Sequence, residues 1–294
     1  MRAFAFASAI SLALTGAGTG EAAPRRVASL NLCTDELVLM LADPRQIVSV
    51  THLAQQSSEN RLWREARRYR RNDGSLVSVA GLRPDLVLTM GGGARDRGRI
   101  ARRLGMRVVD LPFPQSLADI ERSVRIVSAE LGRGPAGLAL LARIRRLKAG
   151  RPAAAADTIW LGGGGRTVAA SGLASEWMSL AGFRQRAVRG DRVSLEQLLV
   201  RPPAVLLRSD YRSGQYSSEQ RWLTHPLARR AKGAREVATD GRPWTCLGPA
   251  LIAEIERLRA LSRHPGASRD LGPVSLGGSP RRPGVRRGDR VDRR

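Results

Sequence analysis

Hydrophobic residues occur along this chain in short continuous runs that alternate with helix-like patterns. The clearest case is GSLVSVAGLRPDLVLTMGGG, residues 74–93, in which the apolar run 86–88 is bounded by turn residues. Such a run is typical of a strand buried on both faces of a parallel sheet. Pro84 disfavours a helical Arg83, and the glycines at 91–93 let the backbone leave the strand. Ligands of open α/β sheets bind outside the carboxyl ends of such strands, so we expect a binding edge at this loop.

The same pattern predicts further strands and helices. The other predicted strands are 26–30, 47–50, 107–111, 158–161, 204–207 and 235–238. Predicted helices begin after a cap at Thr34 or Asp35, at Arg99, after Ser116, at Pro135, at Ser175, after Ser194 and at Pro249. Ser194 and Gln197 have the spacing of a capping box. Alternation of this kind indicates parallel sheets covered by helices.

The alternation pauses once, at residues 132–134, and a helix with apolar residues at a three-residue spacing follows (Leu138, Leu141, Ile144 and Leu147). We interpret that helix as a connector between two α/β lobes that are weakly similar in sequence. The predicted division is a signal peptide at 1–23, a first lobe at 24–133, a connecting helix at 134–152, a second lobe at 153–262 and a disordered tail rich in Arg, Gly and Pro at 263–294.

The first 23 residues have the features of a secretory signal peptide. Arg2 supplies the charge, residues 3–14 are apolar but too short to span a bilayer, and Gly20 and Ala22 are small. Cleavage is expected after Ala22 or Ala23, with no cysteine there for a lipid anchor. We therefore predict an exported, periplasmic protein.

The formal net charge of +24 suggests a nucleic-acid partner at first sight. However, Lys148 and Lys232 are the only lysines, and the arginines are scattered along the chain. Arginine without lysine is more typical of GC-rich coding than of a phosphate-binding face. No nucleic acid is predicted as a partner.

Catalytic motifs are absent from the sequence. The three histidines lie in unrelated contexts, there is no HExxH or GxSxG, and the glycine loops at 91–93 and 162–165 fit neither GxGxxG nor a P-loop. We predict no enzyme activity, no metal site and no cofactor.

Two cysteines remain after the signal peptide, Cys33 before a helix and Cys246 before the last helix. An oxidising compartment permits a bridge between them, but the sequence leaves open whether they are bridged or free. Trp244 lies in the same loop as Cys246. It is either a residue that caps a lobe or, as we prefer, a stacking surface for a ligand.

Four segments together resemble the periplasmic substrate-binding proteins of metal-chelate ABC importers, which carry cobalamin or iron–siderophores. They are RVASLNLCTDELVLMLADPRQIVSV, LRPDLVLTMGGG, VSLEQLLVRPPAVLL and WTCLGPALIAEIERL, within residues 26–262. The resemblance implies two α/β lobes joined by one long rigid helix, with the ligand in the cleft between them. It also implies a monomer that delivers its ligand to a permease.

Carried over by position, the resemblance implies a ligand site formed by Cys33, Thr34, Arg71, Met90, Arg208, Tyr211 and Trp244. Arginines among these residues suit a ligand with carboxylates or phosphate. Glu196 matches the acidic residue that docks to the permease. The equivalent position in the first lobe is Val77, so either Glu59 or Glu65 substitutes for it, or docking is one-sided.

The predicted function is therefore capture of a corrinoid or ferric siderophore and its delivery to an ABC permease. Two other classes remain as alternatives: a basic nucleic-acid-binding protein, and an α/β enzyme that uses the same cleft.

Overall fold

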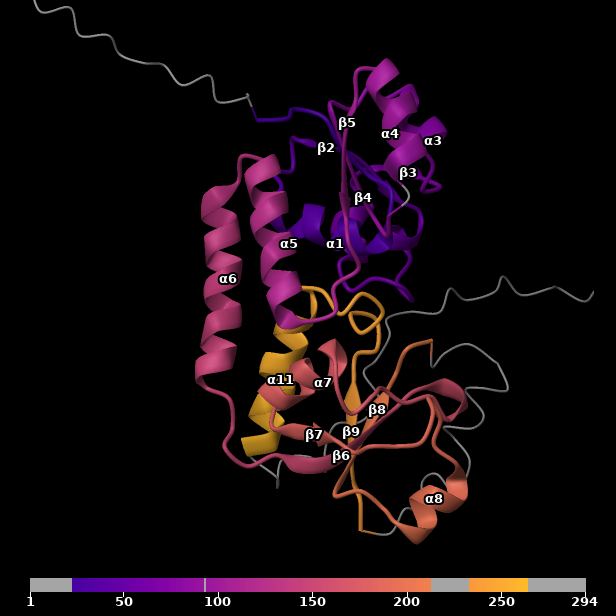
Figure 1. Cartoon of the computed structure of the whole chain (residues 1–294), viewed down its shortest axis with the longest axis vertical. Helices are drawn as coiled ribbons and strands as arrows, with labels where there is room; N and C mark the ends of the chain where they lie inside the picture. Colours follow the sequence, from indigo (N-terminus) through magenta and orange to yellow (C-terminus); the bar gives the residue numbers. More distant parts are fainter. Residues whose placement is uncertain (1–22, 93, 213–232, 264–294) are drawn as a thin grey trace, which may run out of the picture.

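The computed structural model describes residues 23–92, 94–212 and 233–263. The predicted signal peptide, apart from Ala23, and the predicted tail from residue 264 lie outside the described residues. Two sheets organise the chain, one drawn from residues 27–111 and one from residues 156–239. In Figure 1 the first sheet lies above the second, and α5 and α6 run along one side.

The first sheet has the strand order β3-β2-β1-β4-β5. Every neighbouring pair is parallel, and Val27 of β1 is in register with both Ile47 and Leu86. The strands are β1 (Val27–Ser29), β2 (Ile47–Thr51), β3 (Arg70–Asn72), β4 (Leu86–Met90) and β5 (Arg107–Leu111). The helical segments are α1 (Leu32–Leu41), η1 (Leu53–Gln55), α2 (Trp63–Ala66), α3 (Leu76–Ala80), α4 (Ala94–Arg103) and α5 (Leu117–Glu130).

The second sheet has the order β7-β6-β8-β9, again with all neighbouring pairs parallel. Its strands are β6 (Ala156–Leu161), β7 (Phe183–Gln185), β8 (Val205–Ser209) and β9 (Arg235–Thr239). Its helical segments are η2 (Gly163–Gly165), α7 (Leu173–Leu180), α8 (Leu195–Val200) and α11 (Leu251–Arg263). The predicted α/β architecture with two parallel sheets is confirmed.

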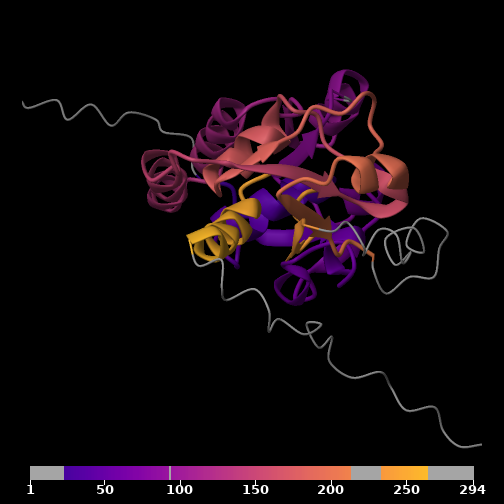
Figure 2. The same cartoon turned by 90° about the horizontal axis from the view of Figure 1, so that it is seen from below.

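Helix α6 (Gly134–Ala149) carries the chain from the first sheet to the second. It packs against α5 and α11, and α11 also packs against α7 (Figures 1 and 2). One apolar cluster is continuous from β4 through α5 and α6 to α7 and α11. The predicted face of the last helix, which includes Leu251, Ile255 and Leu258, is fully buried in it.

One predicted cap was wrong. Helix α1 is capped by Asn31, three residues before Thr34 and four before Asp35, because the Asn31 side chain accepts the Cys33 amide at 2.8 Å. Thr34 and Asp35 lie inside the helix and are buried. Ser116 and Ser194, by contrast, form the caps expected of them, both as capping boxes.

Two edge strands, β3 and β7, were not expected from the sequence. Arg70 and Arg71 of β3 are exposed, and in β7 an exposed Arg184 separates two buried residues. Strands this short carry no apolar run, so only the neighbouring strand identifies them. No helix in the described part of the chain is long and apolar enough to cross a membrane.

Candidate functional site at the junction of the two sheets

Each sheet has a point where the strand order reverses. In the first sheet this point lies between β1 and β4, and in the second between β6 and β8. Ligands of open α/β sheets bind at the carboxyl ends of the strands that flank such a point. Leu30, Asn31 and Gly91 follow the first pair, and Gly162 and Asp210 follow the second.

The carboxyl edges of the two sheets meet. A disulfide joins Cys33, in the first turn of α1, to Cys246, in the loop before α11, with a Cα–Cα distance of 5.2 Å. The two residues are 213 positions apart in sequence. The structure therefore answers the question that the sequence left open. Since α6 is the chain's own connection, the disulfide is a second covalent link between the halves.

A buried carboxylate adds a polar contact across the same junction. Glu59, in the loop between η1 and α2, is 5% exposed. Its oxygens accept the Tyr211 hydroxyl at 2.6 Å and the Arg212 guanidinium at 3.0 and 3.1 Å. Burial alone would raise the pKa of Glu59, but the hydrogen bonds from Arg212 and Tyr211 outweigh it and lower that pKa.

Four further contacts cross between the halves. Arg242 donates to the Ser57 carbonyl at 3.0 Å. Arg61 lies 3.6 Å from carboxylate oxygens of both Asp240 and Glu254. On the other side of the junction the Glu176 carboxylate accepts the Leu117 amide at 2.8 Å, at the N-terminus of α5.

The junction also buries two carboxyl groups of α1. Burial raises the pKa of Asp35 to about 7, against the lowering effect of hydrogen bonds from Thr51 and Ser29. Burial, together with the charges of Asp35 and Asp240, raises the pKa of Glu36 well above its usual value. One Glu36 oxygen has no hydrogen-bond partner among the described residues.

Two of the predicted ligand residues lie at the junction and are engaged by protein groups. Cys33 is in the disulfide and Tyr211 is bonded to Glu59. Thr34 lies beside Cys33 but is fully buried, and its hydroxyl bonds to Ser29 at 2.8 Å and to the Asn31 carbonyl at 2.9 Å.

Trp244 follows β9 in the loop that carries Cys246. It is 7% exposed, donates to Thr239 at 2.9 Å and packs against Trp160 with ring centroids 5.9 Å apart. These contacts fit the alternative interpretation, a residue that caps the end of the second sheet, and ligand stacking by Trp244 stays a prediction.

The remaining predicted ligand residues are dispersed. Met90 is buried at the end of β4, Arg71 is exposed on the edge strand β3, and Arg208 pairs with Glu236 of β9. None of the described contacts brings these three together.

Sequence reasoning missed several residues of the junction. Arg212 gave no signal, because it follows Tyr211 in a polar loop. Phe113 did give one: it is an aromatic residue between Pro112 and Pro114 at the end of β5. It is 56% exposed and contacts Gly91, where an added Cβ would lie 2.7 Å from its ring. Gly91 also has φ +106°, which disfavours any residue with a Cβ. The Phe113 ring and the backbone conformation therefore both exclude a side chain at this position.

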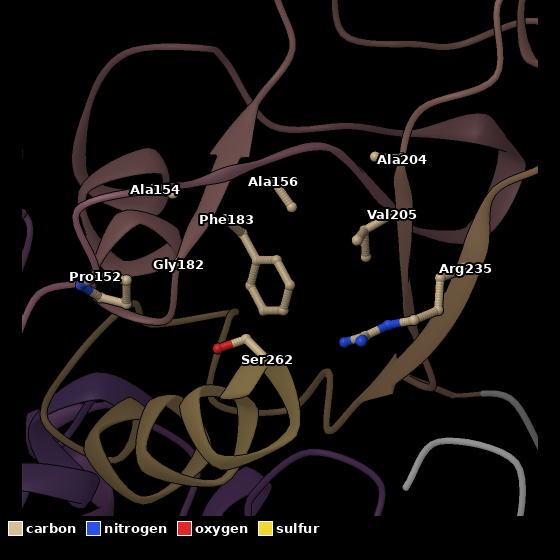
Figure 3. A pocket seen from close by; sticks show the side chains of 9 residues that line it. All are labelled: Pro152, Ala154, Ala156, Gly182, Phe183, Ala204, Val205, Arg235 and Ser262. Carbon is tan, nitrogen blue, oxygen red and sulfur yellow. The ribbon is translucent and has the colours of Figure 1, made fainter. Parts of the chain in front are cut away.

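Two cavities lie away from the junction. One, of about 410 Å³, opens at the amino ends of the second sheet's strands, with Phe183, Arg235 and Ser262 in its lining (Figure 3). The other, of about 400 Å³, is lined by α8, by the segment between β7 and α8 and by Ile159 of β6, with Val188 and Glu196 in its lining. The described residues contain no group of three or more His, Cys, Asp or Glu side chains suited to a metal ion.

The fold is similar to that of two-lobed periplasmic solute-binding proteins. No protein-family model and no curated protein matches the chain. Among solved structures it is similar to the vitamin B12-binding protein BtuF of Vibrio cholerae, with 18% identity and a TM-score of 0.57 over 82% of this chain and 97% of that one. It is also similar to the heme-binding protein RhuT of Roseiflexus sp. RS-1, with 19% identity and a TM-score of 0.61 over 80% and 97%.

A third similar structure is the siderophore-binding protein BauB, bound to acinetobactin and ferric iron, with 12% identity and a TM-score of 0.61 over 81% of this chain and 93% of that one. At these identities the likeness establishes the fold. The resemblance to metal-chelate binders stated from the sequence is confirmed at that level, and these neighbours are binding proteins rather than enzymes.

The disulfide makes a prediction about stability. A loop of this length, cross-linked in the unfolded chain, contributes about 5 kcal/mol in the chain-entropy treatment. The free energy of unfolding of the wild type, measured by denaturant titration, should be lower by about that amount when a thiol reductant is present. The double variant Cys33→Ala, Cys246→Ala should unfold like the reduced protein and be insensitive to reductant. Identical wild-type curves under both conditions would contradict the link.

Glu36 makes a prediction about pH. Because its pKa is raised by folding, the folded state holds the proton more tightly, and stability falls as pH rises above the ordinary glutamate value. Glu36→Gln should therefore raise the free energy of unfolding at pH 8, by about 1–3 kcal/mol. The gain should shrink toward pH 4. The control Glu65→Gln removes an exposed carboxyl group of α2 and should change little at either pH; a pH-independent effect of Glu36→Gln would contradict the assignment.

Proposed function

We propose that this protein is a periplasmic solute-binding protein that captures a metal chelate, a corrinoid or a ferric siderophore, and delivers it to an ABC-importer permease. The observation that carries the proposal is the meeting of two parallel sheets at their carboxyl edges. That edge is where open α/β sheets bind ligands, and here the segment after β1 of the first sheet is joined by the disulfide to the loop after β9 of the second.

The chemistry of the edge fits a large chelate. Phe113 offers an exposed aromatic ring beside the glycine loop, and Arg212 and Tyr211 offer donors for oxyanions. The similar structures are described as binders of vitamin B12, of heme and of a ferric siderophore, all of which are metal chelates. Export follows from the signal-peptide pattern of residues 1–23 together with the periplasmic neighbours.

Docking to the permease is proposed for Glu196. Its carboxylate is exposed near the N-terminus of α8, and hydrogen bonds from its own backbone amide and from Ser194 lower its pKa, which keeps it charged. Val77, at the matching place in the first half, is 86% exposed and uncharged. Glu59 is buried in the junction, so of the two substitutes considered only Glu65 offers an exposed carboxylate.

The binding proposal is tested by titrating the purified protein with cyanocobalamin, dicyanocobinamide, heme and a ferric hydroxamate siderophore. We expect a Kd of about 1 µM or tighter for at least one of them. Phe113→Ala should weaken that binding about two- to tenfold, since aromatic contacts contribute about 0.5–1.5 kcal/mol. Leu138→Ala, which removes an exposed apolar side chain of α6, is the matched control. Absence of binding to all four chelates rejects the proposal.

Docking is tested by chelate uptake in cells that express the cognate permease. Glu196→Gln should slow uptake several-fold while chelate affinity in solution stays unchanged, because the substitution removes a charge from the docking surface only. Glu65→Gln should have no effect if docking is one-sided. Normal uptake with Glu196→Gln would remove Glu196 from the docking surface.

A further inference from the structure

The carboxylate of Glu59 occupies a position in which a ligand group would be well bound. It is contributed by the first half of the chain, whereas both of its strong donors, Tyr211 and Arg212, lie in the loop after β8 of the second half. The guanidinium meets both carboxylate oxygens, and the phenol hydroxyl adds a third hydrogen bond. Arg212 also stacks over the Tyr211 ring at 5.0 Å, so the two donors are held as a pair.

Bidentate pairing with a guanidinium, reinforced by a neutral donor, is the usual way in which proteins hold a carboxylate. The pair lies directly after β8, which flanks the switch point of the second sheet. A ligand bound between the sheets would therefore meet these donors on the side of the second sheet. In this structure Glu59 already accepts hydrogen bonds from both of them.

We propose that Glu59 is an internal competitor: its carboxylate holds Tyr211 and Arg212 until a carboxylate of an acidic chelate replaces it. This inference rests on the proposed function and narrows it, because it favours chelates that carry carboxylates over those whose side groups are neutral amides. Displacement of Glu59 also frees one contact between the halves, while the disulfide keeps them together.

Glu59 and the residues next to it are held by hydrogen bonds, which a carboxylate of a ligand can replace. Besides Arg212 and Tyr211 its hydrogen-bonding neighbour is the Ser58 hydroxyl, at 3.2 Å, and the adjacent Ser57 carbonyl is held by Arg242. The segment is thus a loop fixed to the second half by polar contacts. When Arg212 and Tyr211 bond to a ligand instead, Glu59 loses the two hydrogen bonds that lower its pKa, and that pKa rises.

The test uses heme, which carries two carboxylates, and dicyanocobinamide, whose side groups are amides. Glu59→Gln keeps the shape of the side chain but weakens its hold on the guanidinium. It should tighten heme binding about tenfold, a change of about 1.4 kcal/mol, and leave cobinamide affinity unchanged. The matched control Glu65→Gln removes an exposed carboxylate of the same half and should alter neither affinity.

A second measurement on the wild type does not depend on the folding of a variant. Heme should bind the wild type about tenfold more tightly than heme dimethyl ester, because only free carboxylates can replace Glu59 on the guanidinium. A wild type that binds the ester as tightly as heme, or a Glu59→Gln protein that binds heme no tighter, overturns the competitor while leaving the proposed function intact. If neither the wild type nor Glu59→Gln binds heme or cobinamide, both the competitor and the proposed function are overturned.

Discussion

The disulfide between Cys33 and Cys246 is the constraint on which the arrangement of the two halves depends. The other polar contacts across the junction are few, and those that reach solvent contribute about 0–1 kcal/mol each. The bridge holds the first turn of α1 against the loop before α11. It therefore holds the carboxyl end of β1 close to the loop that follows β9. Glu59, Arg61 and Arg242 act within that frame.

Most of the fold could be predicted because buried parallel strands are nearly continuous apolar runs. Residues 86–88 are completely buried, as expected, and the helices after Ser116 and Ser194 begin at their caps. The failures have two causes. Arg70, Arg71 and Arg184 belong to edge strands, and the start of α1 was a choice among neighbouring cap residues that only the Asn31 side chain decides.

Far less of the site could be predicted, because it is made of contacts between distant loops. Nothing near Glu59 in the sequence indicates that it meets Tyr211 and Arg212, about 150 residues later. From the sequence we assigned ligand stacking to Trp244, whose ring packs on Trp160 in the structure. Phe113 could have been noticed in the sequence, because it lies between two prolines directly after a predicted strand.

Helix α6 meets α5 with almost no space between them. At Gly137 an added Cβ would lie 2.3 Å from the Ser128 hydroxyl oxygen, so the backbones approach as closely as a glycine permits. With sixteen residues the helix is about 24 Å long. From Gly137 to its far end the helix measures about 18 Å, so if it turns rigidly about Gly137, a tilt of about 5° displaces that end by about 1.5 Å. Movements of that size suffice to separate hydrogen-bonded groups, so two lobes joined in this way can part without a wide hinge.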